Sequence, residues 1–170
     1  MSKQPIALFI GVLLCSLSLF SCTQDRQPCL QPKQQRLLAG MYHASDSAGI
    51  ITITSINLPS PYIGTIGAAN NETIYYGATS SGHTYALYMS SVADSCQYFI
   101  KPDTVASTQF DTLSFYYQRQ LNFLSNACGY TYFYSLDHIN TTNHNIDSLV
   151  LKNTLVSTNV NVEHLKIYFH

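Results

Sequence analysis

A chain of 170 residues is long enough for one folded domain and a targeting segment. Hydrophobic residues make up 46% of the chain and charged residues only 10%, and the many Tyr and Phe residues favour strands over helices. The formal net charge is -1 and no basic run occurs, which argues against a nucleic-acid partner, while the aromatic content argues against a disordered chain.

The first 21 residues have the proportions of a secretory signal peptide. Lys3 precedes an apolar run from Ile6 to Phe20. This run is shorter than the roughly 20 residues that a transmembrane helix needs, but it fits the apolar core of a signal peptide. We therefore expect residues 1–21 to be removed. A buried N-terminal helix or a short membrane anchor is the alternative interpretation.

The apolar run ends in Leu19-Phe20-Ser21-Cys22, which resembles a bacterial lipobox. In a lipobox the Cys thiol accepts a diacylglycerol, and a peptidase then cuts before this Cys and requires a small residue there. Phe20 is bulkier than the residue usual at its position. More than one acyl chain makes membrane anchoring stable. The motif predicts a lipidated Cys22, a polar tether over residues 22–36 and a folded domain over residues 37–170.

Three cysteines remain after this processing, because Cys15 leaves with the signal peptide and Cys22 is acylated. Cys29, Cys96 and Cys128 would then lie in a compartment where disulfides persist. Three pairings are possible, and we favour Cys29 with Cys128, joining the end of the tether to the central sheet. In the chain-entropy model a loop of about 100 residues contributes up to about 4.7 kcal/mol. A free, buried Cys128 is the alternative. The cysteine spacing is not that of a metal site, and no cofactor is expected.

The rest of the chain is a series of short segments typical of β-strands. In Asp111–Arg119, Leu113, Phe115 and Tyr117 alternate with polar residues and are expected to share one buried face. Leu121–Cys128 follows and is expected to pair with that strand. Further strands are expected at 37–43, 50–57, 73–77, 84–90, 97–101, 130–137, 148–156 and 160–169, with a turn at 46–49 and a loop at 138–145. Segment 148–156 also suits a short helix.

About nine short strands separated by frequent turn residues indicate an all-β protein. The expected fold is an antiparallel β-sandwich. A closed β-barrel is the alternative.

Several short motifs together resemble a known family. They are the lipobox Cys22, Cys29-Leu30, DTLSFYYQRQ, SNACGY at Ser125–Tyr130 and EHLKIYF at Glu163–Phe169. This set resembles the uncharacterised lipoprotein family of Bacteroidota called domain of unknown function 6452. That family has a lipidated Cys, a second Cys soon after it and an Ala-Cys-Gly near the final third, which match Cys22, Cys29 and Ala127-Cys128-Gly129.

Cys96 departs from the pattern of the family, so the resemblance leaves open whether Cys29 or Cys96 pairs with Cys128. The family has no assigned activity. The resemblance implies a lipid-anchored protein of the cell envelope, commonly at the outer membrane. Because Asp25 is the only acidic residue soon after Cys22, we expect the protein to face the periplasm.

No arrangement of catalytic residues is evident in the sequence, and we expect the protein not to be an enzyme. His138, His144, His164 and His170 lack the HxxxH or HExxH spacing of metal ligands. There is no GxSxG motif and no Gly-rich phosphate loop. A nucleophilic Cys128 is less favoured than a disulfide.

Two functional hypotheses remain. The first is a noncatalytic, lipid-anchored module that interacts with another envelope protein or helps in assembly. The second is a binding module for glycans or another small ligand, which would use the alternating Tyr130, Tyr132 and Tyr134 as a stacking surface. Alternating tyrosines of this kind are also typical of a half-buried strand.

Overall fold

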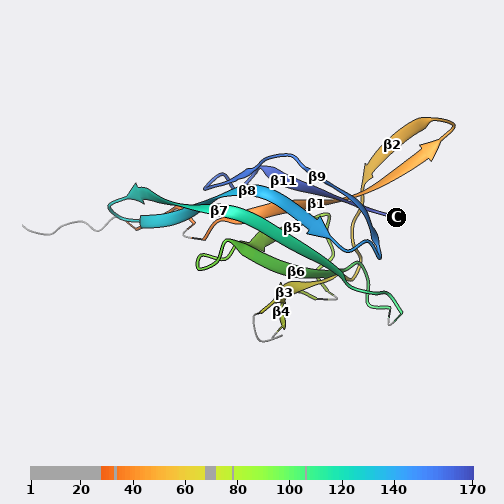
Figure 1. Ribbon diagram of the computed structural model, residues 1–170, viewed down its shortest axis with the longest axis horizontal. Helices are drawn as coiled ribbons and strands as arrows, with labels where there is room; N and C mark the ends of the chain where they lie inside the picture. The colour runs from red at the N-terminus through yellow and green to blue at the C-terminus, as the bar shows by residue number, and fades with distance from the viewer. Residues whose placement is uncertain (1–27, 33, 68–71, 78, 106) are drawn as a thin grey trace, which may run out of the picture.

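The computed structural model describes residues 28–32, 34–67, 72–77, 79–105 and 107–170 (Figure 1). The expected signal peptide, Cys22 and the first part of the proposed tether lie outside the described residues. Where the chain is described, it forms no helix with the length and hydropathy needed to cross a membrane.

Eleven strands form in the described residues. They are β1 Arg36–Ser47, β2 Ile50–Ser55, β3 Tyr62–Ile66, β4 Glu72–Tyr76, β5 Thr84–Tyr88, β6 Ser95–Lys101, β7 Asp111–Ser125, β8 Gly129–Thr141, β9 Ile146–Leu151, β10 Leu155–Val156 and β11 Glu163–Phe169. The expected β-rich domain therefore begins at Arg36, one residue before the predicted first strand.

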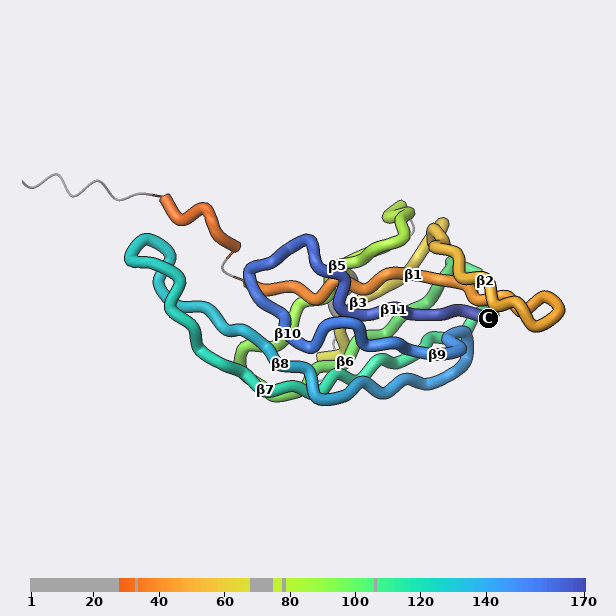
Figure 2. Tube along the Cα trace, turned by 90° about the horizontal axis from the view of Figure 1, so that it is seen from above, coloured from red at the N-terminus to blue at the C-terminus, as the bar shows by residue number. Residues whose placement is uncertain are grey.

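The strands form two sheets, which confirms the all-β sandwich. One sheet has the order β2-β1-β11-β9, with β5 also paired to β1, and the other has the order β10-β8-β7-β6-β3-β4. Figure 2 shows β7 and β8 curving along one side of the molecule, so the second sheet resembles half of a barrel.

The core lies between the two sheets and is built from alternate residues of their strands. Leu113, Phe115 and Tyr117 of β7 are all buried, as their alternation predicts. They pack in one cluster with side chains of the opposite sheet, which include Leu37, Ala39, Met41, Leu87, Ile146, Leu165 and Ile167. The rule of alternation thus assigns the buried face of the central strand correctly.

One pair among the described strands departs from the antiparallel arrangement. β1 and β11 are parallel neighbours, with Met41 opposite Ile167 and Tyr42 opposite Tyr168. The described chain therefore brings its first and last strands together in the middle of a sheet. His164 of β11 is buried beside this pair, and its Nδ1 accepts a hydrogen bond from the Leu38 amide at 3.1 Å.

The predicted hairpin between Asp111–Arg119 and Leu121–Cys128 is wrong. Residues 111–125 form the single long strand β7, because no Gly or Pro interrupts this part of the chain, and Asn122 lies within the strand. The reversal comes after Ser125, where the Ser125 hydroxyl accepts the Cys128 amide at 3.0 Å and Gly129 adopts a φ of 72°. This positive φ favours glycine.

Three further boundaries differ from the predictions. Strand β3 was not predicted, since Pro59 and Pro61 mark only the end of the segment before it. The expected loop at 138–145 is half strand, because β8 continues to Thr141 and the His138 ring stacks on Tyr116 at 4.4 Å. Segment 148–156 contributes to β9 and β10 rather than to a helix.

Tyrosine hydroxyl groups occupy the side of β5 that faces away from β1. The hydroxyl of Tyr76 bonds both the N–H and the C=O of Ala86, at 2.9 and 3.1 Å. Tyr98 bonds the backbone of Tyr88 in the same way, at 2.7 and 2.8 Å. Tyr117 does so at Ser90, at 2.8 and 3.3 Å. We call these three side chains the tyrosine ladder.

The tyrosine ladder performs the role of a neighbouring strand. It satisfies the backbone groups of alternate residues, which would otherwise be unpaired beside the core. Tyr76, Tyr98 and Tyr117 come from β4, β6 and β7 of the other sheet. Their rings therefore fill the core while their hydroxyls join the two sheets, and burial raises the pKa of Tyr98 and Tyr117.

Candidate functional site

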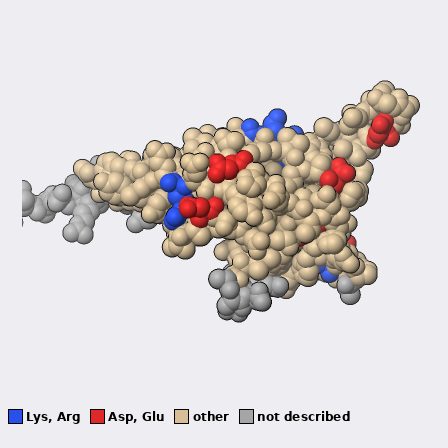
Figure 3. Space-filling model, viewed as in Figure 1, with Lys and Arg blue, Asp and Glu red and all other residues tan. Residues whose placement is uncertain are grey.

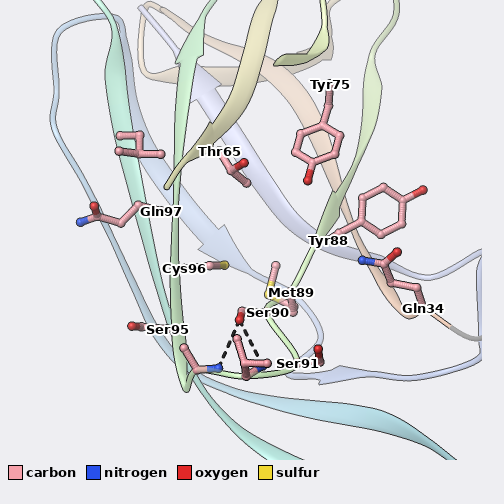
Figure 4. A pocket seen from close by; sticks show the side chains of 13 residues that line it. Gln34, Thr65, Tyr75, Tyr88, Met89, Ser90, Ser91, Ser95, Cys96 and Gln97 are labelled. Atoms are coloured by element: carbon pink, nitrogen blue, oxygen red, sulfur yellow. Dashed lines mark hydrogen bonds between the residues drawn. The ribbon is translucent and has the colours of Figure 1, made fainter. Parts of the chain in front are cut away.

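A half-open pocket lies next to the tyrosine ladder (Figure 4). It has a volume of about 520 Å³. Tyr75 and Tyr88 form one side, with ring centroids 6.0 Å apart, and Cys96 and Ser90 lie on the other side. The remaining lining is Gln34, Thr65, Ile66, Met89, Ser91, Val92, Ala93, Ser95 and Gln97. Every residue in this lining is uncharged.

The polar groups of this pocket are largely used in holding the loop that surrounds it. The Ser90 hydroxyl accepts the amides of Val92 and Ala93 at 3.3 and 3.2 Å. Cys96 is a free cysteine, and burial raises the pKa of its thiol, although a hydrogen bond with Tyr117 acts in the opposite direction. A thiol of raised pKa is a weak nucleophile at neutral pH. The pocket therefore provides a surface for contact and no activated nucleophile.

The disulfide joins Cys29 to Cys128, with their Cα atoms 4.8 Å apart. This is the favoured pairing, and Cys96 is the cysteine left free. Cys128 lies in the turn between β7 and β8 rather than in the centre of the sheet, so the attachment point differs from the prediction. The bond closes a loop over a sequence separation of 99 residues and occupies the Cys128 sulfur, which therefore cannot be a nucleophile.

The end of the β7–β8 hairpin, residues 120–132, extends beyond the other described strands, and we call it the hairpin tip (Figures 1 and 2). Leu121, Phe123 and Tyr130 are 56%, 55% and 64% exposed there. Phe123 lies directly opposite Tyr130, and their ring centroids are 5.2 Å apart. Because Leu121 is two residues from Phe123 on the same strand, the three side chains share one face.

The predicted row of Tyr130, Tyr132 and Tyr134 is not a uniform surface. Tyr130 is exposed at the hairpin tip, Tyr132 is half-buried, and Tyr134 is only 3% exposed. The ring of Tyr134 packs edge-on against Tyr117 in the core, with centroids 5.3 Å apart. The three rings follow one face of β8, but this face passes from solvent into the core.

The four histidines singled out in the sequence occupy separate environments, and His144 lies in the connection between β8 and β9, where its amide donates to Asp111. His138 stacks on Tyr116, and His170 lies 3.8 Å from Asp147. His164 is buried, and burial lowers its pKa. In the described part of the chain no three His, Cys, Asp or Glu residues gather in a way that could hold a metal ion.

Asp111 is a fully buried carboxylate that organises the connection between β8 and β9. One oxygen accepts the Thr142 hydroxyl at 3.1 Å and the His144 amide at 2.7 Å. The other accepts the amides of Asn145 and Ile146 at 2.7 and 3.2 Å, and the Asn145 side chain at 3.0 Å. These bonds use the acceptor positions of the carboxylate, so Asp111 has a structural role.

A second projection lies at the opposite end of the long axis of the molecule (Figure 1). It consists of residues 44–55, the end of β1 and all of β2, and we call it the β1–β2 ribbon. The predicted turn joins the two strands, with Ala48 and Gly49 at φ 54° and 82° and the Gly49 amide bonded to Asp46 at 2.9 Å. All six residues of β2 are exposed. Sequence reasoning identified this strand but not its projection into solvent.

Comparison with known protein families matches residues 63–169 to a Family of unknown function (DUF6452). No curated protein and no solved structure matches the chain. The matched region runs from β3 to the end of β11 and includes both Cys96 and Cys128. It covers more than half of the residues, and the chain therefore belongs to this family of unknown function.

Proposed function

We propose that the protein is a noncatalytic interaction or assembly module of a bacterial cell envelope, anchored by lipid at Cys22. Its proposed place is the outer membrane, facing the periplasm, in a member of the Bacteroidota. The lipobox before Cys22 supports the anchor. The Cys29–Cys128 disulfide is in keeping with a compartment outside the cytoplasm.

The observation that carries the interaction role is the exposed edge of the β1–β2 ribbon. β2 is the last strand in its sheet and pairs only with β1 among the described strands. Ile50, Ile51 and Ile53 are 70%, 69% and 51% exposed, and β2 contains no charge and no proline. An exposed, uncharged edge of this kind can accept a strand from another protein through backbone hydrogen bonds. The proposed partner is therefore an envelope protein that adds a strand to β2.

The β5 edge provides an informative contrast within the same sheet. There the tyrosine ladder pairs the backbone of Ala86, Tyr88 and Ser90. Among the described residues no corresponding side chains cover β2, and all six residues of this strand are exposed. The availability of β2 is thus a local property of the ribbon.

The anchor is tested by a Cys22→Ser variant expressed with its complete N-terminal segment. This variant should lose lipid labelling and accumulate as an uncleaved precursor, because the serine hydroxyl does not accept the diacylglycerol that precedes cleavage. Mass spectrometry of the purified protein and labelling with a radioactive fatty acid measure both effects. A Cys15→Ser variant is the matched control and should be processed normally. Normal cleavage of Cys22→Ser would contradict the proposed anchor.

The interaction role is tested by replacing Ile51 with a photoreactive amino acid in cells. Irradiation should give discrete crosslinks to an envelope protein, and adding Ile53→Lys should reduce their yield, because a charge on the strand opposes β-pairing. Val105 is 55% exposed and lies in a loop, so the same photoreactive group at Val105 is the control. Equal crosslinking from both positions, or none from Ile51, would contradict the proposed role of β2.

Glycan or small-ligand binding on Tyr130, Tyr132 and Tyr134 has less support. A stacking platform needs ring faces that a ligand can reach. Tyr134 uses its ring in the core and Tyr132 is half-buried, so Tyr130 alone offers an open ring in that row.

A further inference from the structure

The hairpin tip combines exposed apolar side chains with a complete absence of charge. Leu121, Phe123 and Tyr130 share one face. Between Arg119 and Asp137 the sequence contains no Asp, Glu, Lys or Arg. Figure 3 shows no charged residue on the visible face of this end until the first blue and red groups toward the body. Such a surface avoids the large free-energy cost of moving a charged side chain into an apolar environment.

A charged pair marks the inner boundary of this uncharged surface. Arg119 bonds Asp94 at 2.6 Å and the Ser91 carbonyl at 2.6 Å, and its guanidinium lies 5.9 Å from the centre of the Tyr132 ring. From the hairpin tip toward the body of the domain, the exposed aromatic and aliphatic side chains come first. Tyr132 follows, and the ion pair of Arg119 with Asp94 comes last. The aromatic side chains lie at the tip and the charged side chains lie closer to the body of the domain. This arrangement matches the distribution of residues at a membrane–water interface.

The disulfide fixes the hairpin tip to the segment that leads toward Cys22. Cys29 is seven residues from Cys22, which corresponds to about 25 Å of fully extended chain. The disulfide transfers this limit directly to Cys128 in the hairpin turn. Without it, the covalent path from Cys22 would first reach the sheet at Arg36, after fourteen residues or about 50 Å. Leu30, which is 90% exposed, follows Cys29 on the same short path.

We propose that the hairpin tip docks on the lipid bilayer that holds the N-terminal acyl chains, inserting Phe123, Tyr130 and Leu121 into the interface. This inference rests on the proposed lipidation of Cys22 and adds a second, noncovalent contact to it. Confinement of the tip within about 25 Å of the surface gives it a high effective concentration there, so a few apolar side chains are sufficient. The docked tip would direct the β1–β2 ribbon, at the opposite end of the long axis, away from the membrane.

The absence of tryptophan from the chain makes a direct test possible. Full-length Phe123→Trp protein is purified with its lipid and reconstituted in vesicles of phosphatidylethanolamine and phosphatidylglycerol, with and without brominated acyl chains. The fluorescence of Phe123→Trp should be at least about twofold lower in vesicles with brominated acyl chains than in vesicles without them. The tryptophan emission should also lie at shorter wavelength in vesicles than in solution. Ile51→Trp, at a similarly exposed position on the β1–β2 ribbon, is the matched control and should be unaffected.

A second arm tests the role of the disulfide. Adding Cys29→Ser and Cys128→Ser to Phe123→Trp should lower the quenching, because the path from the lipid to the tip becomes longer. Equal quenching with and without the disulfide would overturn the proposed positioning of the tip.

The remaining outcomes separate the two proposals. Protein that carries lipid on Cys22 and floats with the vesicles, yet shows no quenching of Phe123→Trp, would overturn the docking of the tip alone. A blue-shifted but unquenched signal would also overturn it, since the tip would then be covered by protein, such as a second copy of the chain. Absence of lipid on Cys22 and failure to float would overturn both proposals.

Discussion

Replacing Asp111 with alanine should lower the free energy of unfolding by about 3–5 kcal/mol. The carboxylate is fully buried and accepts hydrogen bonds from Thr142, His144, Asn145 and Ile146. The substitution leaves several buried backbone N–H groups without an acceptor. Their lost solvation lowers the free energy of unfolding by more than the net contribution of the hydrogen bonds themselves. Since domains are stable by only about 5–15 kcal/mol, this single change should bring the protein close to its unfolding threshold. Urea denaturation measures the effect.

Two further variants separate the hydrogen bonds of Asp111 from its charge. Asp137 is exposed on β8 and only weakly bonded to Gln118, at 3.5 Å, so Asp137→Ala should change stability by less than about 0.5 kcal/mol. Asp111→Asn keeps one acceptor oxygen but turns an amide donor toward other donors, so its effect should lie close to that of Asp111→Ala. If Asp111→Ala were as harmless as Asp137→Ala, the structural role given to Asp111 would be wrong.

Removal of the disulfide should cost up to about 4.7 kcal/mol, because the unfolded chain regains the freedom of a loop of about 100 residues. In thermal unfolding this corresponds to a decrease of roughly 10–20 °C in Tm. Cys29→Ser, Cys128→Ser and the double variant should show the same loss, since each removes the same covalent bond. Urea and thermal denaturation under non-reducing conditions measure it.

Reduction provides an independent control for the same bond. A reducing agent should lower the stability of the unmodified protein to that of the variants and should leave the variants unchanged. Cys96 is free, so Cys96→Ala should respond to reduction as the unmodified protein does. Stability that does not change on reduction would be incompatible with a bond that closes most of the domain.

The parts of the fold that the sequence predicts are those determined by neighbouring residues. Alternation identifies Leu113, Phe115 and Tyr117 as a buried face because successive side chains of a strand point to opposite sides. The turn at Ala48-Gly49 is predicted because positive φ angles favour glycine. Cysteine counting leaves Cys29, Cys96 and Cys128 after processing, and the favoured pair Cys29–Cys128 is the one that forms.

The parts that the sequence does not predict depend on partners distant in the chain. The hydroxyl groups of Tyr76, Tyr98 and Tyr117 bond to backbone atoms, which have no residue type and leave no sequence signal. Asp111 stands at the start of a strand like many acidic residues, and only the fold brings residues 142–146 to it. The length of β7 is not predicted, because Asn122 suits a turn as well as a strand and only the pairing with β8 keeps the chain extended through it.

The candidate surfaces were also beyond sequence reasoning. Phe123 and Tyr130 are typical core residues, and their exposure follows from the length of the β7–β8 hairpin, which extends past the opposite sheet. Ile50, Ile51 and Ile53 would be buried in most strands with this composition. Whether such residues lie in the core or in solvent depends on where the facing sheet ends, and this is a property of the whole fold.

The parallel pairing of β1 with β11 has a consequence for the order in which the domain can form. A hydrogen bond between these strands joins positions 126 residues apart, and β11 lies in the middle of its sheet with β1 on one side and β9 on the other. Until the last strand is available, β1 and β9 have no common neighbour, and the core side chains Leu165 and Ile167 are missing. Contacts of such long range slow the folding of a chain. The sheet that contains β1 and β9 can therefore be completed only when β11, the last of the described strands, has been synthesised.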